Sequence, residues 1–148
     1  MPLTCVEQEV GGQFSPDGRW VAYTSNASGR NEIYVRPFPG SGEAVQVSAS
    51  GGSQPRWRRD GHELFYVALD GSVTSVLVTV ANDRQAMEPG TPRQLFFVRL
   101  AAGPNIYPGR AQYAVAADGR FLLNISIDDV TASPIGIVLN WDAVLRKP

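Results

Sequence analysis

Hydrophobic and polar positions alternate in short runs along this chain, and clusters of turn residues separate the runs. Three similar phrases each contain an Asp-Gly pair followed by an apolar run, at Asp17-Gly18, Asp60-Gly61 and Asp118-Gly119. An Asp-Gly pair between two apolar runs favours a tight hairpin, because glycine adopts a positive φ without steric cost. We therefore predict a strand, a tight turn and a second strand around each pair. No long helical periodicity is visible, so the sequence predicts an all-β fold.

The strand after each Asp-Gly pair is apolar on both faces, which predicts burial between two sheets. A third strand follows in each unit, and a fourth in the first two units. The predicted second strands are Trp20–Ser25, Leu64–Leu69 and Phe121–Ile127; the third strands are Glu32–Phe38, Val73–Val80 and Ile135–Trp141; the fourth strands are Ala44–Ser48 and Arg93–Val98. Proline and glycine between the third and fourth strands indicate loops.

Four antiparallel strands that recur every ~40–45 residues are typical of a β-propeller blade. Asp17 and Asp60 are 43 residues apart, and Asp60 and Asp118 are 58 apart. We place the extra residues of the second interval in loops at Ala81–Glu88 and Ala101–Arg110. The prediction is one partial propeller domain, 1–148, with three four-stranded blades at about 11–50, 51–99 and 110–141, the third short of a strand.

Particular stretches also resemble a known family. FSPDGRWVAYTSN, GRNEIYVRPFP and GGSQPRWRRDGHELFY resemble the WD-like repeats of TolB-type β-propellers, and IGIVLNWDAVLRK resembles the end of such propellers where they follow bacterial serine/threonine kinase domains. The resemblance extends from about Gly11 to Lys147. It implies a propeller fold and a sensor-like binding role, since such propellers serve many partners. The chain has only three repeats and no kinase motifs.

Three blades leave an arc open, because propellers typically have 4–8 blades. Residues 2–6 precede the first unit, where the fourth strand of a preceding blade would lie. We predict that two chains close a six-bladed ring as a homodimer by strand exchange. The strand at 2–6 of a partner chain, or of the same chain, would complete the third blade. The expected seam residues are Leu3, Cys5, Ile137 and Leu139. The alternative is that the chain is an arc of a longer propeller.

Charge and targeting signals narrow the function class. Thirteen basic and 14 acidic residues give a net charge of −1, so no global field draws the chain to nucleic acid or an anionic membrane. We find no signal peptide and no apolar run of the ~20 residues that a spanning helix needs. As written, the chain is expected to be cytoplasmic, unless it is part of a longer membrane-anchored protein. The single cysteine, Cys5, excludes an internal disulfide.

Catalytic and metal-binding patterns are weak. The Gly-x-Ser-x-Gly nucleophile elbow is missing, and the one histidine, His62, follows an Asp-Gly turn where an exposed polar residue is expected. One histidine and one distant cysteine give no zinc spacing. Asp128-Asp129 could bind a hard cation, but such a pair is usually just solvated. We therefore predict no catalytic residue, no metal and no cofactor.

The candidate ligand-binding residues are polar positions expected at one mouth of the ring: Gln54, Arg56, Gln112, Asn26, Arg30 and Asp128. Arg56 is expected to face the central channel while the neighbouring Trp57 enters the core. Arg56 would either pair with Glu63 or Asp60, or anchor an acidic or carboxylate-bearing partner. Gln54 and Gln112 both lie six positions before an Asp-Gly aspartate. They would either read a peptide backbone or hold blade to blade.

These patterns favour a non-catalytic binding or scaffold module. Its ligand would be a peptide, a protein segment or a small solute, bound at the ring mouth. One alternative is an accessory propeller that gates substrate for a hydrolase. Another is a fragment of a larger propeller without a function of its own.

Overall fold

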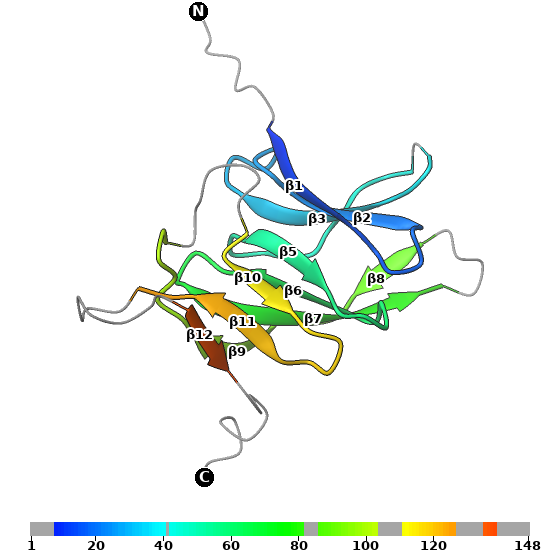
Figure 1. The fold of residues 1–148 in the computed structure, drawn as a ribbon. Coiled ribbons are helices and arrows are strands. Elements are labelled where there is room, and N and C mark those ends of the chain that lie inside the picture. Colours follow the sequence, from blue (N-terminus) through cyan, green and yellow to red (C-terminus); the bar gives the residue numbers. More distant parts are fainter. Residues whose placement is uncertain (1–7, 41, 82–85, 104–110, 127–134, 139–148) are drawn as a thin grey trace, which may run out of the picture.

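The chain folds as three antiparallel sheets that follow one another along the sequence (Figure 1). A computed structural model describes residues 8–40, 42–81, 86–103, 111–126 and 135–138. Over these ranges the chain forms strands and turns and no helix, which confirms the all-β prediction. The predicted turns at Asp17-Gly18, Asp60-Gly61 and Asp118-Gly119 are present, and their glycines have positive φ values of 71°, 75° and 85°.

The first sheet contains four strands in sequence order, each antiparallel to the next. They are β1 (Glu9–Phe14), β2 (Trp20–Ser25), β3 (Glu32–Pro37) and β4 (Val45–Gln46). β2 begins and ends at the residues predicted for the second strand of this unit. Gly11 and Gly12 lie inside β1 at a bulge, where Gly11 has a φ of 68°. The bulge needs a residue that tolerates this backbone conformation.

The second sheet corrects the expected four-stranded unit, because it has five strands. They are β5 (Ser53–Trp57), β6 (Glu63–Val67), β7 (Ser72–Val80), β8 (Met87–Pro89) and β9 (Arg93–Phe97). The nine-residue β7 has two partners along one edge: β9 pairs with Ser72–Ser75, and β8 pairs with Val78–Val80. The extra strand falls partly in the segment expected to be a loop, Ala81–Glu88, because the far end of β7 offers unpaired backbone groups there.

The third sheet comprises β10 (Tyr113–Val115), β11 (Phe121–Asn124) and β12 (Ile135–Val138). Its hairpin is one residue shorter than the other two. Val115 pairs with Phe121, three positions after the aspartate, whereas Trp57 pairs with Leu64, four positions after it. A shift of one residue moves every following side chain to the opposite face of the sheet.

This shift corrects the expectation that the second strand of the third unit is buried on both faces. Leu123 takes the inward position that Tyr66 has in the second sheet. β11 is buried on one face only, since Phe121 is 0% exposed and Leu122 is 47% exposed. β2 and β6, by contrast, are almost wholly buried, as the sequence predicts.

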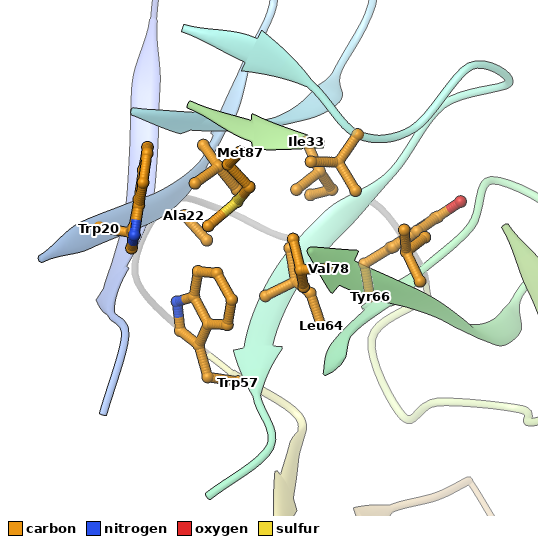
Figure 2. Packing of buried hydrophobic residues seen from close by; sticks show 11 residues of the cluster. Trp20, Ala22, Ile33, Trp57, Leu64, Tyr66, Val78 and Met87 are labelled. Carbon is orange, nitrogen blue, oxygen red and sulfur yellow. The ribbon is translucent and has the colours of Figure 1, made fainter. Parts of the chain in front are cut away.

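Two clusters of buried side chains join the sheets. The first packing interface, between the first and second sheets, brings Trp20 and Ala22 against Trp57, Leu64 and Tyr66, with Met87 of β8 at its edge (Figure 2). The second packing interface, between the second and third sheets, contains Phe65, Val67, Val73, Leu95, Leu100, Tyr113, Phe121 and Leu123. Burying this apolar surface is the main favourable term that holds sheet to sheet.

The prediction that Trp57 enters the core is confirmed. It is 8% exposed, and its indole Nε1 donates to the Gln13 carbonyl across the first packing interface at 3.1 Å. Phe14 occupies the same place relative to its Asp-Gly pair, yet it is 58% exposed. Trp57 has a preceding sheet to pack against, and among the described residues Phe14 has none.

Candidate functional site

An open recess of about 560 Å³ lies along the first strand of the third sheet, β10. Its lining combines one cation with amide and apolar groups: Arg56, Ala111, Gln112, Tyr113, Ala114, Leu122, Leu123 and Asn124. Arg56 comes from β5, so the recess spans the second and third sheets. Two residues proposed from the sequence, Arg56 and Gln112, therefore lie together in one place, with Gln54 beside them.

The Arg56 guanidinium is held on one side and open on the other. Its Nη1 donates to the Pro55 carbonyl at 2.8 Å, its Nε donates to the Tyr113 carbonyl at 3.4 Å, and its Cζ lies 5.9 Å from the centre of the Tyr113 ring. Among the described residues none of these contacts is a carboxylate. The ion pair expected with Glu63 or Asp60 is made by Arg58 instead, at 3.0 Å and 3.3 Å.

Gln54 and Gln112 connect the second and third sheets. The Gln112 backbone N–H donates to Gln54 Oε1 at 2.8 Å, and the Tyr113 hydroxyl donates to the Gln54 carbonyl at 2.8 Å. The side-chain amide of Gln112 is also used, because its Oε1 accepts from Ala102 N and its Nε2 donates to the Gly103 carbonyl. Of the two roles open from the sequence, the geometry favours holding sheet to sheet.

Tyr113 completes this connection as a buried hydrogen-bond donor. Burial raises the pKa of its hydroxyl well above the usual value, and the nearby Arg56 cation offsets this only partly. The hydroxyl therefore stays protonated at neutral pH and can donate to the Gln54 carbonyl. Tyr66 at the first packing interface behaves similarly, since burial, reinforced by the Glu32 and Asp70 charges, raises its pKa to about 12.

Asn26 and Arg30, also proposed as ligand contacts, lie in the turn between β2 and β3 and have structural partners. Asn26 Oδ1 accepts from Gln8 N at 2.8 Å. Arg30 Nε donates to Glu32 at 2.6 Å, and its Nη2 donates to the Ala49 carbonyl at 2.5 Å. Neither lines the recess around β10.

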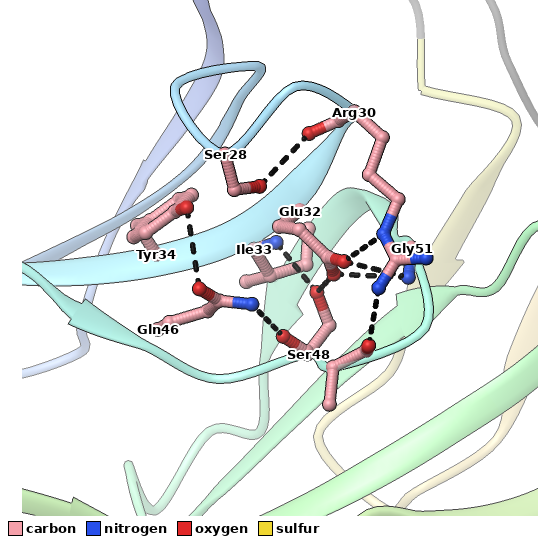
Figure 3. Close-up of polar contacts among 9 residues, drawn as sticks. Ser28, Arg30, Glu32, Ile33, Tyr34, Gln46, Ser48 and Gly51 are labelled. Carbon is pink, nitrogen blue, oxygen red and sulfur yellow. Dashed lines mark hydrogen bonds and ion pairs between the residues drawn. The ribbon is translucent and has the colours of Figure 1, made fainter.

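Glu32 is the buried acid that sequence reasoning missed (Figure 3). Its side chain is 0% exposed and accepts hydrogen bonds from Arg30 Nε, from the Ser48 hydroxyl and from Gly51 N, the last at 3.0 Å to each carboxylate oxygen. Ser48 in turn accepts from Ile33 N. The carboxylate thus ties β3 to the link between the first two sheets. The only signal in the sequence is an acid at the start of an apolar strand.

Of the remaining predicted site residues, four lie outside the part of the chain that the structure describes: Asp128, Leu3, Cys5 and Leu139. Ile137 lies in β12, where it pairs with Leu122 of β11. The proposed strand at 2–6 is also outside the described ranges, so strand exchange stays a prediction.

A second crevice, of about 740 Å³, lies at the first packing interface between the turns Asp17-Gly18 and Asp60-Gly61. Ser15, Asp17 and His62 line it, but the Ser15 hydroxyl donates to Asp17 at 2.5 Å rather than to His62. This hydrogen bond is the largest cause that lowers the pKa of Asp17 below its usual value. The absence of a catalytic role stays a prediction.

Metal-ligating side chains are dispersed over the part of the chain that the structure describes. No three residues of the types His, Cys, Asp and Glu gather in a way that could hold an ion within those ranges. Nor does that part of the chain contain a helix with the length and apolar character needed to cross a membrane.

Comparison with known proteins gives a partial similarity to solved structures. The chain matches no family model, and no curated protein matches it. It is similar to a solved structure described as "putative TolB" from Agrobacterium tumefaciens, with 24% identity over 57% of this chain and a TM-score of 0.40. The similarity covers 34% of that protein, so this chain spans about a third of its length.

Proposed function

We propose that this chain is a non-catalytic binding module built from three β-propeller blades, and that the recess around β10 binds a carboxylate of a peptide or protein segment. The observation that carries the proposal is the Arg56 guanidinium, which is fixed by two carbonyls and has no carboxylate partner among the described residues. An arginine presents paired N–H donors that match a carboxylate.

The surroundings support this ligand class. Leu122 and Ala114 give the recess an apolar wall on which a peptide side chain can pack, and Asn124 adds an amide. Ligand sites typically combine an apolar lining with a few polar groups. The three consecutive sheets, each beginning with its innermost strand in the blade interpretation, support the propeller proposal, because a central channel then lies beside β5 and β10.

The test is binding of a hexapeptide library that ends in a free carboxylate, with the same library ending in a carboxamide as the comparison. Binding is followed from the amide signals of Gln112, Ala114 and Asn124 in NMR spectra. We expect Arg56→Gln to weaken binding of the carboxylate peptides about tenfold to a hundredfold, the usual contribution of a charge-assisted hydrogen bond.

Arg59→Gln is the matched control, since it removes the same charge from an exposed residue outside the recess. It should leave binding unchanged. Equal binding of the carboxylate and carboxamide libraries, or equal loss in both variants, would contradict the proposal. So would the absence of any signal change in the recess at millimolar peptide.

A further inference from the structure

The outward face of the first sheet repeats the positions that form the first packing interface. Phe14 pairs with Val21, and Tyr23 lies two residues further along the same face. Their counterparts in the second sheet are Trp57, Leu64 and Tyr66, which have the same spacing from the aspartate. Those three are 8%, 0% and 4% exposed because they pack on the first sheet. We call the outward face of the first sheet the leading face.

The leading face is a preformed aromatic surface. Phe14 meets Phe38 edge-on, with ring centres 4.9 Å apart, and both rings are about half exposed, at 58% and 48%. Tyr23 stacks on Tyr34 at 6.0 Å, and the Arg36 guanidinium lies 5.5 Å from the Tyr23 ring. The exposed, mutually packed rings of Phe14 and Phe38 are typical of a docking surface, whereas Tyr23 is only 7% exposed.

The opposite end of the arc carries the complementary face. On the third sheet, Ala114 and Leu122 pair with each other and point away from Phe121 and Leu123. Their counterparts on the second sheet, Arg56 and Phe65, also pair with each other, and they face the third sheet. We call the surface around Ala114 and Leu122 the trailing face. Leu122, at its centre, is 47% exposed, whereas Phe65 is 2% exposed.

We propose that these two faces bind each other in a second copy of this chain, the leading face of one copy packing on the trailing face of the other. The occupant follows from the repeat: a leading face packs on a trailing face twice within the chain, and among the described residues each copy has one face of each kind that no other sheet covers. The net charge of −1 opposes such an association little. In a dimer the contact is made twice, which leaves neither face exposed.

Light scattering on a sizing column, with the full chain across a wide dilution series, tests the proposal. The expected particle has twice the 16.0 kDa chain mass. Phe14→Arg and Leu122→Arg should each raise the dimer dissociation constant about a hundredfold, as for a residue at the centre of an interface. Leu77→Arg is the control, because Leu77 is an exposed leucine of β7 that belongs to neither face.

Mixing the two variants identifies which faces meet. Each variant alone has only damaged contacts, but the mixture restores one native contact between the intact leading face of Leu122→Arg and the intact trailing face of Phe14→Arg. We therefore expect a heterodimer only on mixing. Circular dichroism checks that each variant is folded before the two are mixed.

Three results would overturn the proposal: a monomer at every concentration, a dimer that survives in both variants, or a Leu122→Arg dimer with a Phe14→Arg monomer. The last would mean that two leading faces bind each other. The trailing face shares Ala114 and Leu122 with the recess around β10, so a dimer would compete with a peptide bound there. Arg56 belongs to neither unpaired face, so Arg56→Gln should leave the dimer intact while it weakens peptide binding.

Discussion

The two packing interfaces join sheets of the same repeat, yet they do so with different chemistry. The first is a hydrocarbon and indole core that contains Trp20 and Trp57, and the Glu32 carboxylate accepts hydrogen bonds from the link beside it. The second combines a group of aromatic rings around Phe121 with hydrogen bonds from Gln54 and Gln112. The repeat therefore determines where sheets touch, while the contacts that fix each pair of sheets are particular to it.

The largest effect is expected at the second packing interface. Phe121 is fully buried, and its ring centre lies 5.1 Å from Phe65, 5.4 Å from Phe96 and 6.3 Å from Tyr113. Phe121→Ala should lower the free energy of unfolding by about 3–5 kcal/mol, the usual cost of such a cavity. Urea denaturation measures this. A loss below about 1 kcal/mol would mean that the third sheet contributes little to stability.

At the first packing interface the corresponding test is Glu32→Ala. The change leaves Gly51 N and the Ser48 hydroxyl without their acceptor, so we expect a loss of about 2–3 kcal/mol by the same denaturation measurement. Arg30→Gln is the control. Because the Arg30 side chain is 54% exposed and the Glu32 carboxylate keeps the Ser48 hydroxyl and Gly51 N as donors, its removal should cost less than Glu32→Ala. Equal losses of unfolding free energy in the two variants would show that the ion pair with Arg30, and not the hydrogen bonds from Gly51 N and Ser48, accounts for the stabilisation by Glu32.

Gln112→Leu tests whether the amide contacts are specific to the second packing interface. The variant keeps the side-chain bulk but loses the hydrogen bonds with Ala102 N and the Gly103 carbonyl. We expect a loss of about 1–2 kcal/mol and faster amide hydrogen exchange at Ala102. The NMR signal of the Trp57 indole N–H, which reports on the first packing interface, should stay unchanged before global unfolding. A simultaneous change at both places would contradict the separation.

The smallest effect concerns the Asp17 turn beside the first packing interface. The Ser15 hydroxyl is the main cause that holds the Asp17 pKa below its usual value. A carboxyl with a lowered folded-state pKa stabilises the fold above the unfolded pKa, and this contribution is lost as pH falls through the folded value. Asp17→Ala should thus cost under about 1 kcal/mol at neutral pH.

The stability difference between Asp17→Ala and the parent chain should shrink once the pH falls below the unfolded pKa. Thermal unfolding, followed from neutral pH down into the acidic range where carboxyl groups titrate, measures it. A difference that stays constant over this range would show that the ionised carboxylate is not the stabilising form.

The strands were largely predictable because Asp-Gly pairs and apolar runs are local signals, so β2, β3 and β9 lie close to where the sequence places them. The shorter third hairpin was not predictable. The letters FLLN align equally well whether Phe121 or Leu122 pairs with Val115, and only the backbone pairing decides between these two registers. β8 was missed because its pairing depends on the length of β7.

The candidate site was predictable in part. Gln54, Arg56 and Gln112 are brought together, because equivalent repeat positions lie near one another when sheets pack in sequence order. The predicted partner of Arg56 was wrong, since Arg58 is placed by the turn to contact both Asp60 and Glu63. Glu32 could not be identified, because its donors Ser48 and Gly51 come from a link whose path no local pattern specifies.

The two partners of β7 also bear on aggregation. The segment Ser72–Val80 has nine residues, rich in valine and without a charge, which is the composition of chains that stack into cross-β fibrils. Such a segment is hazardous when one backbone edge is exposed. Here β6 covers one edge, and β8 and β9 share the other. The short strand β8 therefore covers the part of this edge that β9 does not pair with, where an exposed edge would favour fibril formation.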